Sequence, residues 1–360
     1  MKYRLNMIKI KVKNLKNILV IRFSAMGDVV LTVPVIQNLL RKYPDTQITV
    51  LTNSFYHPFF EGISNLTLYP VDLKGKHKGI LGLWKLVKEL TSIQQFDAVI
   101  DLHSVMRSWV MGVFFRLKGI KVYKIDKGRS EKKAFIQGKT KKALPHTTQR
   151  YQKVFKQAGF DFKLEKSLLP ITKPTERLDN ILSTFSKITI GVAPFAAHKS
   201  KEWGLDKIKE LIHQINLKSS VQFYLFGGGD KEVTQLTTLA NDFENVTNVA
   251  GQFSLQEEIQ VLRNLSVFIG MDSGNAHIAS LTGISVLTIW GGTHPDIGFS
   301  PLYQEKDNCI LPKKSIEKTC QYTIYGTSEH QMKEAPYFCI ARIEVKRILE
   351  RLAALGILKT

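Results

Sequence analysis

Short apolar runs alternate with amphipathic segments along the first half of the chain. Residues 17–23, NILVIRF, are typical of a buried strand, and a tight SAMGD turn follows them. From Val30 to Leu40 the apolar residues recur at helical spacing, and the pattern stops near Pro44. The next run, ITVLT, predicts a second strand. This strand–helix–strand order is typical of a doubly wound parallel sheet.

The same reading extends through the rest of the first half. Residues 96–102 and 121–126 predict further strands, and residues 84–91, 105–117 and 147–158 predict helices. Residues 118–142 are rich in Lys and Arg and are expected to form a mobile loop.

The second half repeats the strand-to-loop pattern. KITIGVAP, VQFYLFGGGD, NVTNVAG, SVFIGMDSG and ISVLTIWGG each place an apolar run before a polar or Gly-rich turn, and a helix is expected from about Asp206. Pro170 and Pro174 mark the linker between the halves. We therefore expect a first domain over residues 1–172 and a second over 173–342. Residues 343–360 predict an amphipathic helix that returns to the first domain.

Charge separates the two halves. The 360 residues carry a formal net charge of +20, and residues 1–172 hold all of it, with 31 Lys and Arg against 11 Asp and Glu. A domain this basic attracts a polyanion, which leaves open a nucleic acid, an anionic membrane, a phosphorylated substrate or a merely solvated surface.

The cysteine content and the lengths of the apolar runs indicate in which cellular compartment the chain is expected. Cys309, Cys320 and Cys339 are too few for a disulfide framework and form no CxxC pair, so packed thiols are expected. The N-terminal segment shows no secretory leader, and no run approaches the length of a membrane span. The chain is expected to be cytoplasmic.

Polar residues collect where the predicted strands end. Open parallel sheets bind ligands at the carboxyl ends of their strands, and SAMGD, DLHS, APFAAHKSKEW, FGGGD, GMDSGNAH and GGTHPD follow strands here. Two such edges facing one another would form one deep cleft.

Asp28 opens the first helix after the tight turn that Gly27 permits. Asp is favoured as a helix cap, so a purely structural role stays open. A carboxylate at this edge is also suited to take a proton from an acceptor hydroxyl as a general base.

The segment 271–280, MDSGNAHIAS, places a helix start directly after a strand. Free backbone N–H groups and the helix dipole make such a start an anion site, Gly274 allows close approach, and Ser273 and His277 add polar groups. Asp272 is better suited to sugar hydroxyls than to a phosphate. Helix capping by Asp272 or Ser273 is the alternative.

Two further segments are weaker indications. In HKSKEW, Lys199 and Lys201 precede Trp203, and a lysine here could neutralise a diphosphate leaving group or be simply solvated. The glycines of FGGGD suit a nucleotide but are common in any strand–helix turn. No Asp-x-Asp pair or His/Cys cluster has metal-ligand spacing, so no metal and no cofactor are expected.

Taken together, RFSAMGDVVLTVPVIQNLL, HKSKEW and GMDSGNAHIASLTGISVLTIWGGTHPD resemble glycosyltransferase family 9, the bacterial lipopolysaccharide heptosyltransferases. The HTTQRY segment, with His146, Arg150 and Tyr151, is also similar. The resemblance implies a GT-B fold of two Rossmann-like domains. It further implies inverting, metal-independent transfer of a heptose, or a related sugar, from an ADP-sugar.

The resemblance also implies site roles. Asp28 matches the catalytic base, and the donor contacts fall on Lys201, Phe253, Asp272, Ser273, Gly274, Asn275 and His277. Acceptor contacts are expected from Met26, Gly27, His103 and Arg107. The family's acceptors are anionic glycolipid cores, which would account for the basic first half and for binding to the inner face of the inner membrane. Leu31 stands where many members have His, and Ser273 where many have Thr.

Three other functions compete with this one. A GT-B-like sugar-nucleotide epimerase would share the cleft but release a free sugar. A non-enzymatic binder of membranes or nucleic acid would explain the charge but not MDSGNAH or HKSKEW, and no nucleic-acid-binding signature is present. A dehydrogenase is disfavoured because no GxGxxG follows the first strand.

Overall fold

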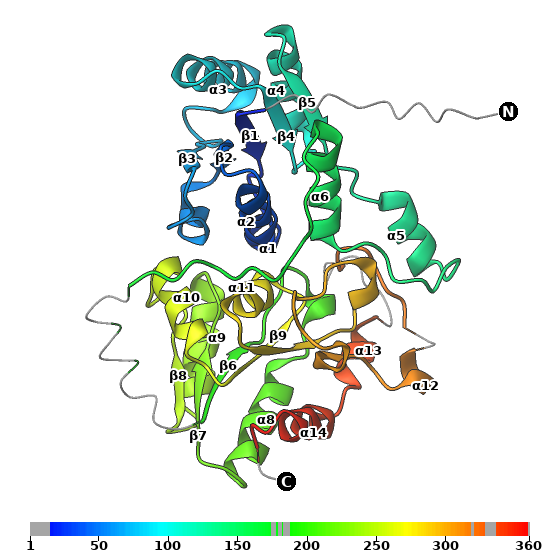
Figure 1. The fold of residues 1–360 in the computed structure, drawn as a ribbon. Helices are drawn as coiled ribbons and strands as arrows, with labels where there is room; N and C mark the ends of the chain where they lie inside the picture. The colour runs from blue at the N-terminus through cyan, green and yellow to red at the C-terminus, as the bar shows by residue number, and fades with distance from the viewer. Residues whose placement is uncertain are drawn as a thin grey trace, which may run out of the picture.

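The computed structural model describes residues 15–173, 178, 182, 188–317, 320–327 and 336–358. They form two α/β domains, which lie one above the other in Figure 1. Residues 1–14, and Pro174 of the expected linker, lie outside the described residues.

The first domain is a five-stranded parallel sheet in the order β3-β2-β1-β4-β5. Its elements are β1 (Asn17–Ile21), α1 (Met26–Val30), α2 (Thr32–Lys42), β2 (Gln47–Thr52), η1 (Ser54–Phe59), β3 (Leu66–Pro70), α3 (Gly79–Ile93), β4 (Ala98–Asp101), α4 (Met106–Leu117), β5 (Lys121–Lys124), α5 (Arg129–Ile136) and α6 (Thr147–Ala158).

The second domain is a six-stranded parallel sheet in the order β11-β10-β9-β6-β7-β8. Its elements are β6 (Ile188–Ala193), η2 (Lys199–Lys201), α8 (Leu205–Asn216), β7 (Val221–Leu225), α9 (Asp230–Ala240), β8 (Val246–Asn248), α10 (Leu255–Arg263), β9 (Val267–Met271), α11 (Gly274–Thr282), β10 (Ser285–Ile289), η3 (Pro295–Ile297), η4 (Lys306–Asn308), β11 (Cys309–Ile310), α12 (Lys314–Glu317), α13 (Pro336–Ala341) and α14 (Val345–Ala354).

The central strand β1 shows why its sequence is a continuous apolar run. Ile18 and Val20 point to the core shared with α2 and α6, whereas Leu19 and Ile21 point to the core beneath α3 and α4. A parallel strand covered by helices on both faces has no polar side, so alternation is lost. In register, Val20 lies opposite residues of both neighbouring strands, β2 and β4.

The two domains share one apolar core. The cluster beneath α2 and α6 continues through α10 and α11 to Phe226 and Phe268 of the second sheet. The domains also touch directly at α1 and α11. This continuous packing sets the carboxyl ends of both sheets across from each other.

Two expectations need correction, and one strand had not been expected. Residues 118–142 are not one mobile loop, because they contain β5 and the helix α5. Residues 66–70 form the edge strand β3, which had not been predicted. The C-terminal helix α14 packs on α8, and its buried Ile348 and Leu352 join the second-domain core rather than the first domain.

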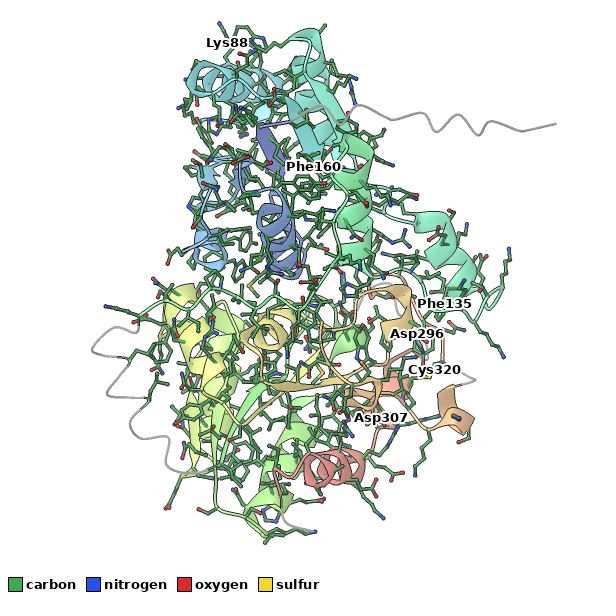
Figure 2. All side chains as sticks on the ribbon, viewed as in Figure 1. Lys88, Phe135, Phe160, Asp296, Asp307 and Cys320 are labelled. Carbon is green, nitrogen blue, oxygen red and sulfur yellow. A yellow bond between two sulfur atoms is a disulfide. The ribbon has the colours of Figure 1, made fainter. Side chains whose placement is uncertain are left out.

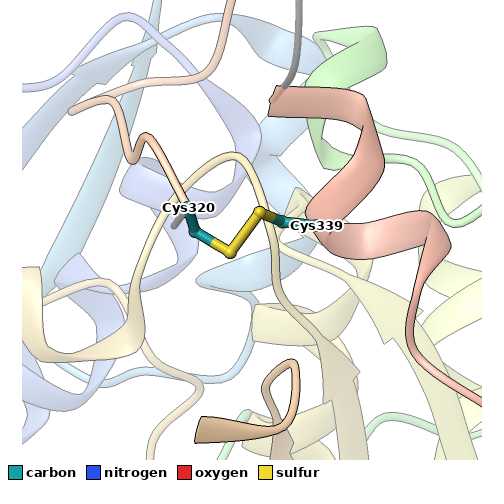
Figure 3. Close-up of a disulfide and its surroundings, with 2 residues drawn as sticks. All are labelled: Cys320 and Cys339. Atoms are coloured by element: carbon teal, nitrogen blue, oxygen red, sulfur yellow. A yellow bond between two sulfur atoms is a disulfide. The ribbon is translucent and has the colours of Figure 1, made fainter. Parts of the chain in front are cut away.

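The cysteine expectation is also wrong in part. Cys320 and Cys339 form a disulfide that ties the segment before residue 327 to α13 (Figure 3). Cys309 is a free, half-buried thiol. No helix among the described residues is long and apolar enough to cross a bilayer.

Candidate functional site

A cavity of about 380 Å³ opens between the domains where the strands of both sheets end. Its first-domain wall contains Arg22, Gly27, Asp28, Lys127, Arg129, Lys132, Thr147, Arg150 and Tyr151. Its second-domain wall contains Ala197, Lys201, Asp272, Ser273, Gly274, His277, Phe299, Ile324 and Tyr325. The cavity therefore gathers residues from sequence segments that lie up to three hundred positions apart.

Asp28 sits in the first turn of the short helix α1, one residue after Gly27. Its carboxylate forms an ion pair with Arg22, and a third of its side chain stays exposed, whereas Arg22 is buried. Arg22 also donates from Nη1 to the Leu102 carbonyl oxygen at 2.6 Å. The guanidinium is thus anchored by the first sheet, and it positions the Asp28 carboxylate at the cavity.

Tyr151 supports the same turn from α6. Its hydroxyl donates to the backbone oxygen of Asp28 at 3.1 Å, and the Arg22 guanidinium lies 6.0 Å from the ring centroid. Complete burial raises the pKa of Tyr151 above its usual range, so the hydroxyl stays a neutral donor. Strand, helix α1 and helix α6 together hold Asp28 in place.

Gly27 and Gly274 allow the two walls to meet. A Cβ built on Gly27 would lie 2.7 Å from Cδ2 of His277 and 3.4 Å from the Gly274 Cα. A Cβ on Gly274 would lie 2.6 Å from Cε of Met26. The glycine-rich turns are therefore required by the contact between α1 and α11, and not only by local turn geometry.

Lys201 and Asp272 form a paired charge on the second-domain wall. Lys201 Nζ donates to Asp272 Oδ2 at 3.0 Å, and Thr293 Oγ1 donates to the same oxygen at 2.7 Å. Both charged side chains are about nine-tenths buried. A buried pair this well bonded places a cation directly beside a carboxylate at the cavity.

The N-terminus of α11 opens onto the cavity next to this pair. Ser273 is the residue before the helix, and its Oγ is buried without a hydrogen-bond partner within the described part of the chain. The Nδ1 atom of His277 is likewise buried and has no hydrogen-bond partner among the described residues. Burial lowers the pKa of His277, so the ring is neutral at pH 7. Two unsatisfied polar atoms beside a helix start are suited to the oxygens of an anion.

Four cations face this helix start from the first domain: Lys127, Arg129, Lys132 and Arg150. Lys132 lies over the Phe299 ring of the second domain, 3.8 Å from its centroid. Its burial, and secondarily the nearby Arg150 charge, lower the pKa of Lys132 to about 8. Burial likewise lowers the pKa of Lys127. Arg150 is paired with Glu131 at 2.6 Å.

The segment that carries these cations reaches across to the second domain. Phe135 of α5 packs against His294 with ring centroids 5.3 Å apart, and the Leu144 amide donates to the Asp296 carbonyl oxygen at 2.8 Å. Phe135 and Asp296 lie near one another at the side of the molecule in Figure 2. His146, ahead of α6, bonds the Ser300 carbonyl oxygen at 2.9 Å. These contacts fold the basic segment over the cavity.

The structure brings seven of the expected site residues to the cavity: Gly27, Asp28, Lys201, Asp272, Ser273, Gly274 and His277. The other five do not line it. Met26 packs on Gly274, His103 packs edge-on against Phe23, Arg107 is exposed, Asn275 is half-buried on α11, and Phe253 packs against the core near α10. Their binding roles stay predictions.

Four cationic residues of the cavity had not been expected from the motifs: Arg22, Lys127, Arg129 and Lys132. Arg22 is the one charge within the apolar run of residues 17–23, and a buried charge directly after a strand indicates a site. Lys132 gives no such local indication, because its burial depends on Phe299 of the other domain. Across the described residues, no three His, Cys, Asp or Glu side chains are grouped so as to bind a metal.

Comparison with known proteins decides the family. The profile of glycosyltransferase family 9 (heptosyltransferase) matches residues 83–325, more than half of the chain. The chain belongs to glycosyltransferase family 9. This family 9 chain is therefore a glycosyltransferase, and its two parallel-sheet domains have the GT-B arrangement.

Individual relatives agree with this family. The chain is 24% identical over 302 residues to the lipopolysaccharide core heptosyltransferase OpsX of Haemophilus influenzae. The similar region covers 82% of this chain and 84% of that protein. Its fold is similar to a glycosyltransferase family 9 structure from Veillonella parvula, with a TM-score of 0.72, 21% identity and coverage of 94% and 97%. It is also similar to the Escherichia coli ADP-heptose lipopolysaccharide heptosyltransferase II, with a TM-score of 0.65, 20% identity and coverage of 94% and 98%.

Proposed function

We propose that this family 9 enzyme transfers a heptose, or a closely related sugar, from an ADP-sugar to an anionic lipopolysaccharide core acceptor. The observation that carries the proposal is the cavity itself. It sets a carboxylate on the first-domain wall against a paired lysine and a helix N-terminus on the second. The relatives support the choice of sugar and acceptor, since OpsX and the E. coli enzyme are described as acting on lipopolysaccharide.

In the proposed reaction, Asp28 takes the proton from the acceptor hydroxyl as that oxygen attacks the anomeric carbon of the donor. The bond from this carbon to the diphosphate oxygen breaks on the opposite face, which inverts the configuration. Arg22 and Tyr151 hold the turn that carries Asp28. A general base of this kind contributes roughly 10²–10⁴-fold to the rate.

Charge on the departing ADP would be met by groups of the second domain. The Lys201 ammonium, the free N–H groups at the start of α11 and the unsatisfied Ser273 Oγ all lie at the cavity. Asp272, held by Lys201 and Thr293, would accept hydrogen bonds from the sugar hydroxyls. These groups supply positive potential where charge develops, which supports a mechanism without a metal.

The acceptor would lie along the first-domain wall. Arg22, Lys127, Arg129, Lys132 and Arg150 exceed the two carboxylates paired with them, Asp28 and Glu131, so this wall carries net positive charge. Acidic sugars and phosphates of a lipopolysaccharide core match such a wall. We also propose that the enzyme works in the cytoplasm on the inner face of the inner membrane, where a lipid-linked acceptor would be found.

The test is transfer from ADP-heptose to deeply truncated lipopolysaccharide, measured by mass spectrometry with and without a chelator. Equal transfer in both conditions, with inversion at the anomeric carbon, is the expected result. Loss of transfer in chelator would contradict metal independence. Transfer from another nucleotide sugar, but not from ADP-heptose, would keep the reaction and discard the heptose.

A further inference from the structure

Large apolar side chains are exposed in one region of the first domain. Of the thirteen exposed large hydrophobic residues in the described chain, eight lie on α3 and α4. The eight are Ile80, Leu81, Trp84, Ile93, Met106, Trp109, Val113 and Leu117. The two helices pack side by side over the outer face of the first sheet, on the side away from the second domain (Figure 1). We call these eight side chains the α3–α4 face.

Helix α4 is apolar on both sides. Ser108, Met111, Gly112 and Phe115 are buried against the sheet. Met106, Trp109, Val113 and Leu117 recur at spacings of three and four residues on the opposite side, and Met106 and Leu117 are 78% and 79% exposed. A helix on the surface of a water-soluble protein usually carries polar residues on its solvent-facing side. Single exposed hydrophobics are ordinary, but a continuous stripe marks a binding surface.

The charges around this stripe have one sign. Residues 102–124 contain Arg107, Arg116, Lys118, Lys121 and Lys124 and no acidic residue. All five are exposed. On α3, Lys85 and Lys88 are exposed beside Leu81, and Lys88 lies at the outer end of the domain in Figure 2. The α3–α4 face therefore combines apolar side chains with a basic border.

Both exposed tryptophans are paired with lysine. The Lys88 ammonium lies 4.2 Å from the Trp84 ring centroid, and the Lys124 ammonium lies 5.9 Å from that of Trp109. The indole N–H of Trp109 donates to Ser104 Oγ at 3.1 Å. Tryptophan with a satisfied polar edge, next to long basic side chains, is the composition favoured at the headgroup level of a bilayer.

The position of the face relates it to the cavity. Both helices follow parallel strands and run back along the sheet, so their N-termini lie at the edge where the strands end. That edge also holds the cavity. Burial lowers the pKa of His103, just ahead of α4, and the nearby charges of Arg22, Lys127 and Arg107 lower it further. The stripe thus starts beside the cationic wall.

We propose that the α3–α4 face docks on an anionic lipid bilayer, with Trp84 and Trp109 among the headgroups and the basic border on the lipid phosphates. The proposal rests on the proposed function, because docking would hold the enzyme at the membrane that contains its acceptor. A second copy of this chain would have to bring two borders of equal positive charge together, which is unfavourable. An anionic surface satisfies both the apolar stripe and its border.

The test compares binding of two double variants to vesicles. Leu81→Glu/Leu117→Glu places two carboxylates on the face, at residues whose exposure keeps the fold unaffected. Leu217→Glu/Ile171→Glu makes the same chemical change at two residues that are 73% and 81% exposed elsewhere. Wild type and the second variant should co-sediment with phosphatidylglycerol-containing vesicles. The first variant should bind at least about tenfold more weakly, because each interfacial charge changes binding about fivefold.

Tryptophan fluorescence gives a second readout. Trp203 and Trp290 are buried, so a blue shift on adding anionic vesicles would come from Trp84 and Trp109. The shift should disappear in Trp84→Phe/Trp109→Phe. Equal binding of the two double variants would overturn the proposal, as would equal binding of wild type to neutral phosphatidylcholine vesicles. A wild-type dimer that Leu81→Glu/Leu117→Glu converts to monomer, without vesicle binding, would assign the face to a second copy.

Activity separates this proposal from the proposed function. With an acceptor stripped of its lipid chains, Leu81→Glu/Leu117→Glu should transfer sugar at the wild-type rate, since neither residue lines the cavity. Vesicle binding without transfer by any form would count against the proposed function alone. Transfer without vesicle binding would count against the docking face alone.

Discussion

The two walls of the cavity are built in different ways. The charges on the second-domain wall are balanced, because Lys201 and Asp272 neutralise each other, and these charged residues come from two compact strand-to-helix turns, β6 to α8 and β9 to α11. The first-domain wall carries an excess of cations that come from the residue after β1, the segment after β5, α5 and α6. Under the proposed function, the ADP of the donor is always the same chemical group, and short local motifs can hold it. An extended, variable acceptor calls for a surface assembled from distant segments.

The largest expected effect comes from removing the carboxylate on the first wall. Asp28→Asn should lower the transfer rate by roughly 10²–10⁴-fold, because an amide cannot take the acceptor proton. Binding of ADP, measured by calorimetry, should be unchanged, since the second wall would remain intact. Asp45→Asn changes an exposed carboxylate of the same domain and should keep the wild-type rate.

The Asp28→Asn variant tests directly whether proton transfer and ADP binding belong to different walls of the cavity. If Asp28→Asn weakens ADP binding as much as it lowers the rate, the two walls do not have separate roles. A residual rate within tenfold of wild type would assign the base to another residue.

The next effect concerns the contact between the walls. Gly27→Ala places a methyl group 2.7 Å from the His277 ring, so either this ring or the contact between α1 and α11 must shift. Displacement of reacting groups by about 1 Å can cost on the order of 10² in rate, and we expect a loss of tenfold to a hundredfold. Gly112→Ala is the matched control, because its methyl group would meet only ordinary contacts in α4. The turnover rates of both variants, with their melting temperatures, provide the measurement.

A wild-type rate in Gly27→Ala would show that the walls need not touch for transfer. A loss of melting temperature equal in both variants, with equal rates, would reduce the glycine requirement to helix stability.

The third effect concerns ADP binding by the charged pair on the second wall. Lys201→Gln removes the ammonium and leaves Asp272 facing the diphosphate, so ADP should bind about tenfold more weakly or worse, as for loss of a charge-assisted bond of about 1.5–3 kcal/mol. Lys201→Gln/Asp272→Asn should recover part of the affinity, because the unpaired carboxylate is then gone. Calorimetry with ADP measures both, and the acceptor KM should stay unchanged. A larger change in acceptor KM than in ADP affinity would reverse the assignment of the walls.

The difference between the walls also sets how far the sequence could predict the site. Lys201, Asp272, Ser273 and His277 stand in contiguous motifs after strands, and all of them reach the cavity. The helix over residues 147–158 and the parallel sheets were likewise readable from local patterns, and they are confirmed. Local chemistry and strand order are enough where ligand contacts follow directly from strand ends.

The rest depended on contacts between distant residues. The α5 helix lies in a stretch whose charge is typical of a solvated loop, and Phe135 and Lys132 gain their packing from His294 and Phe299 of the other domain. Gly27 was interpreted as a turn residue only, because the sequence does not reveal that His277 lies next to it in space. The pairing of Cys320 with Cys339 and the packing of α14 on α8 are tertiary in the same sense.

The smallest effect, and the one that isolates the first wall, is the pH dependence of acceptor binding. The pKa of Lys132 is about 8, below its usual 10.5, because burial and Arg150 disfavour its charge. Lys132 is therefore largely charged at pH 7 and largely neutral at pH 9. The acceptor KM should rise several-fold across this range while ADP affinity stays level. Lys132→Gln should raise KM at pH 7 and flatten the dependence, whereas Lys133→Gln, at the exposed neighbour, should behave as wild type.

Stability gives an independent check with its own sign. The folded-state pKa of Lys132 lies below the unfolded value, so the unfolded chain binds more protons between pH 8 and 10.5. The contribution of this lysine to the free energy of unfolding should therefore rise with pH across that window, and in Lys132→Gln the rise should be smaller than in Lys133→Gln. If wild type and Lys132→Gln share one pH profile for both KM and unfolding, Lys132 is not the titrating cation, and the excess charge of the first wall must act through Lys127 and the arginines.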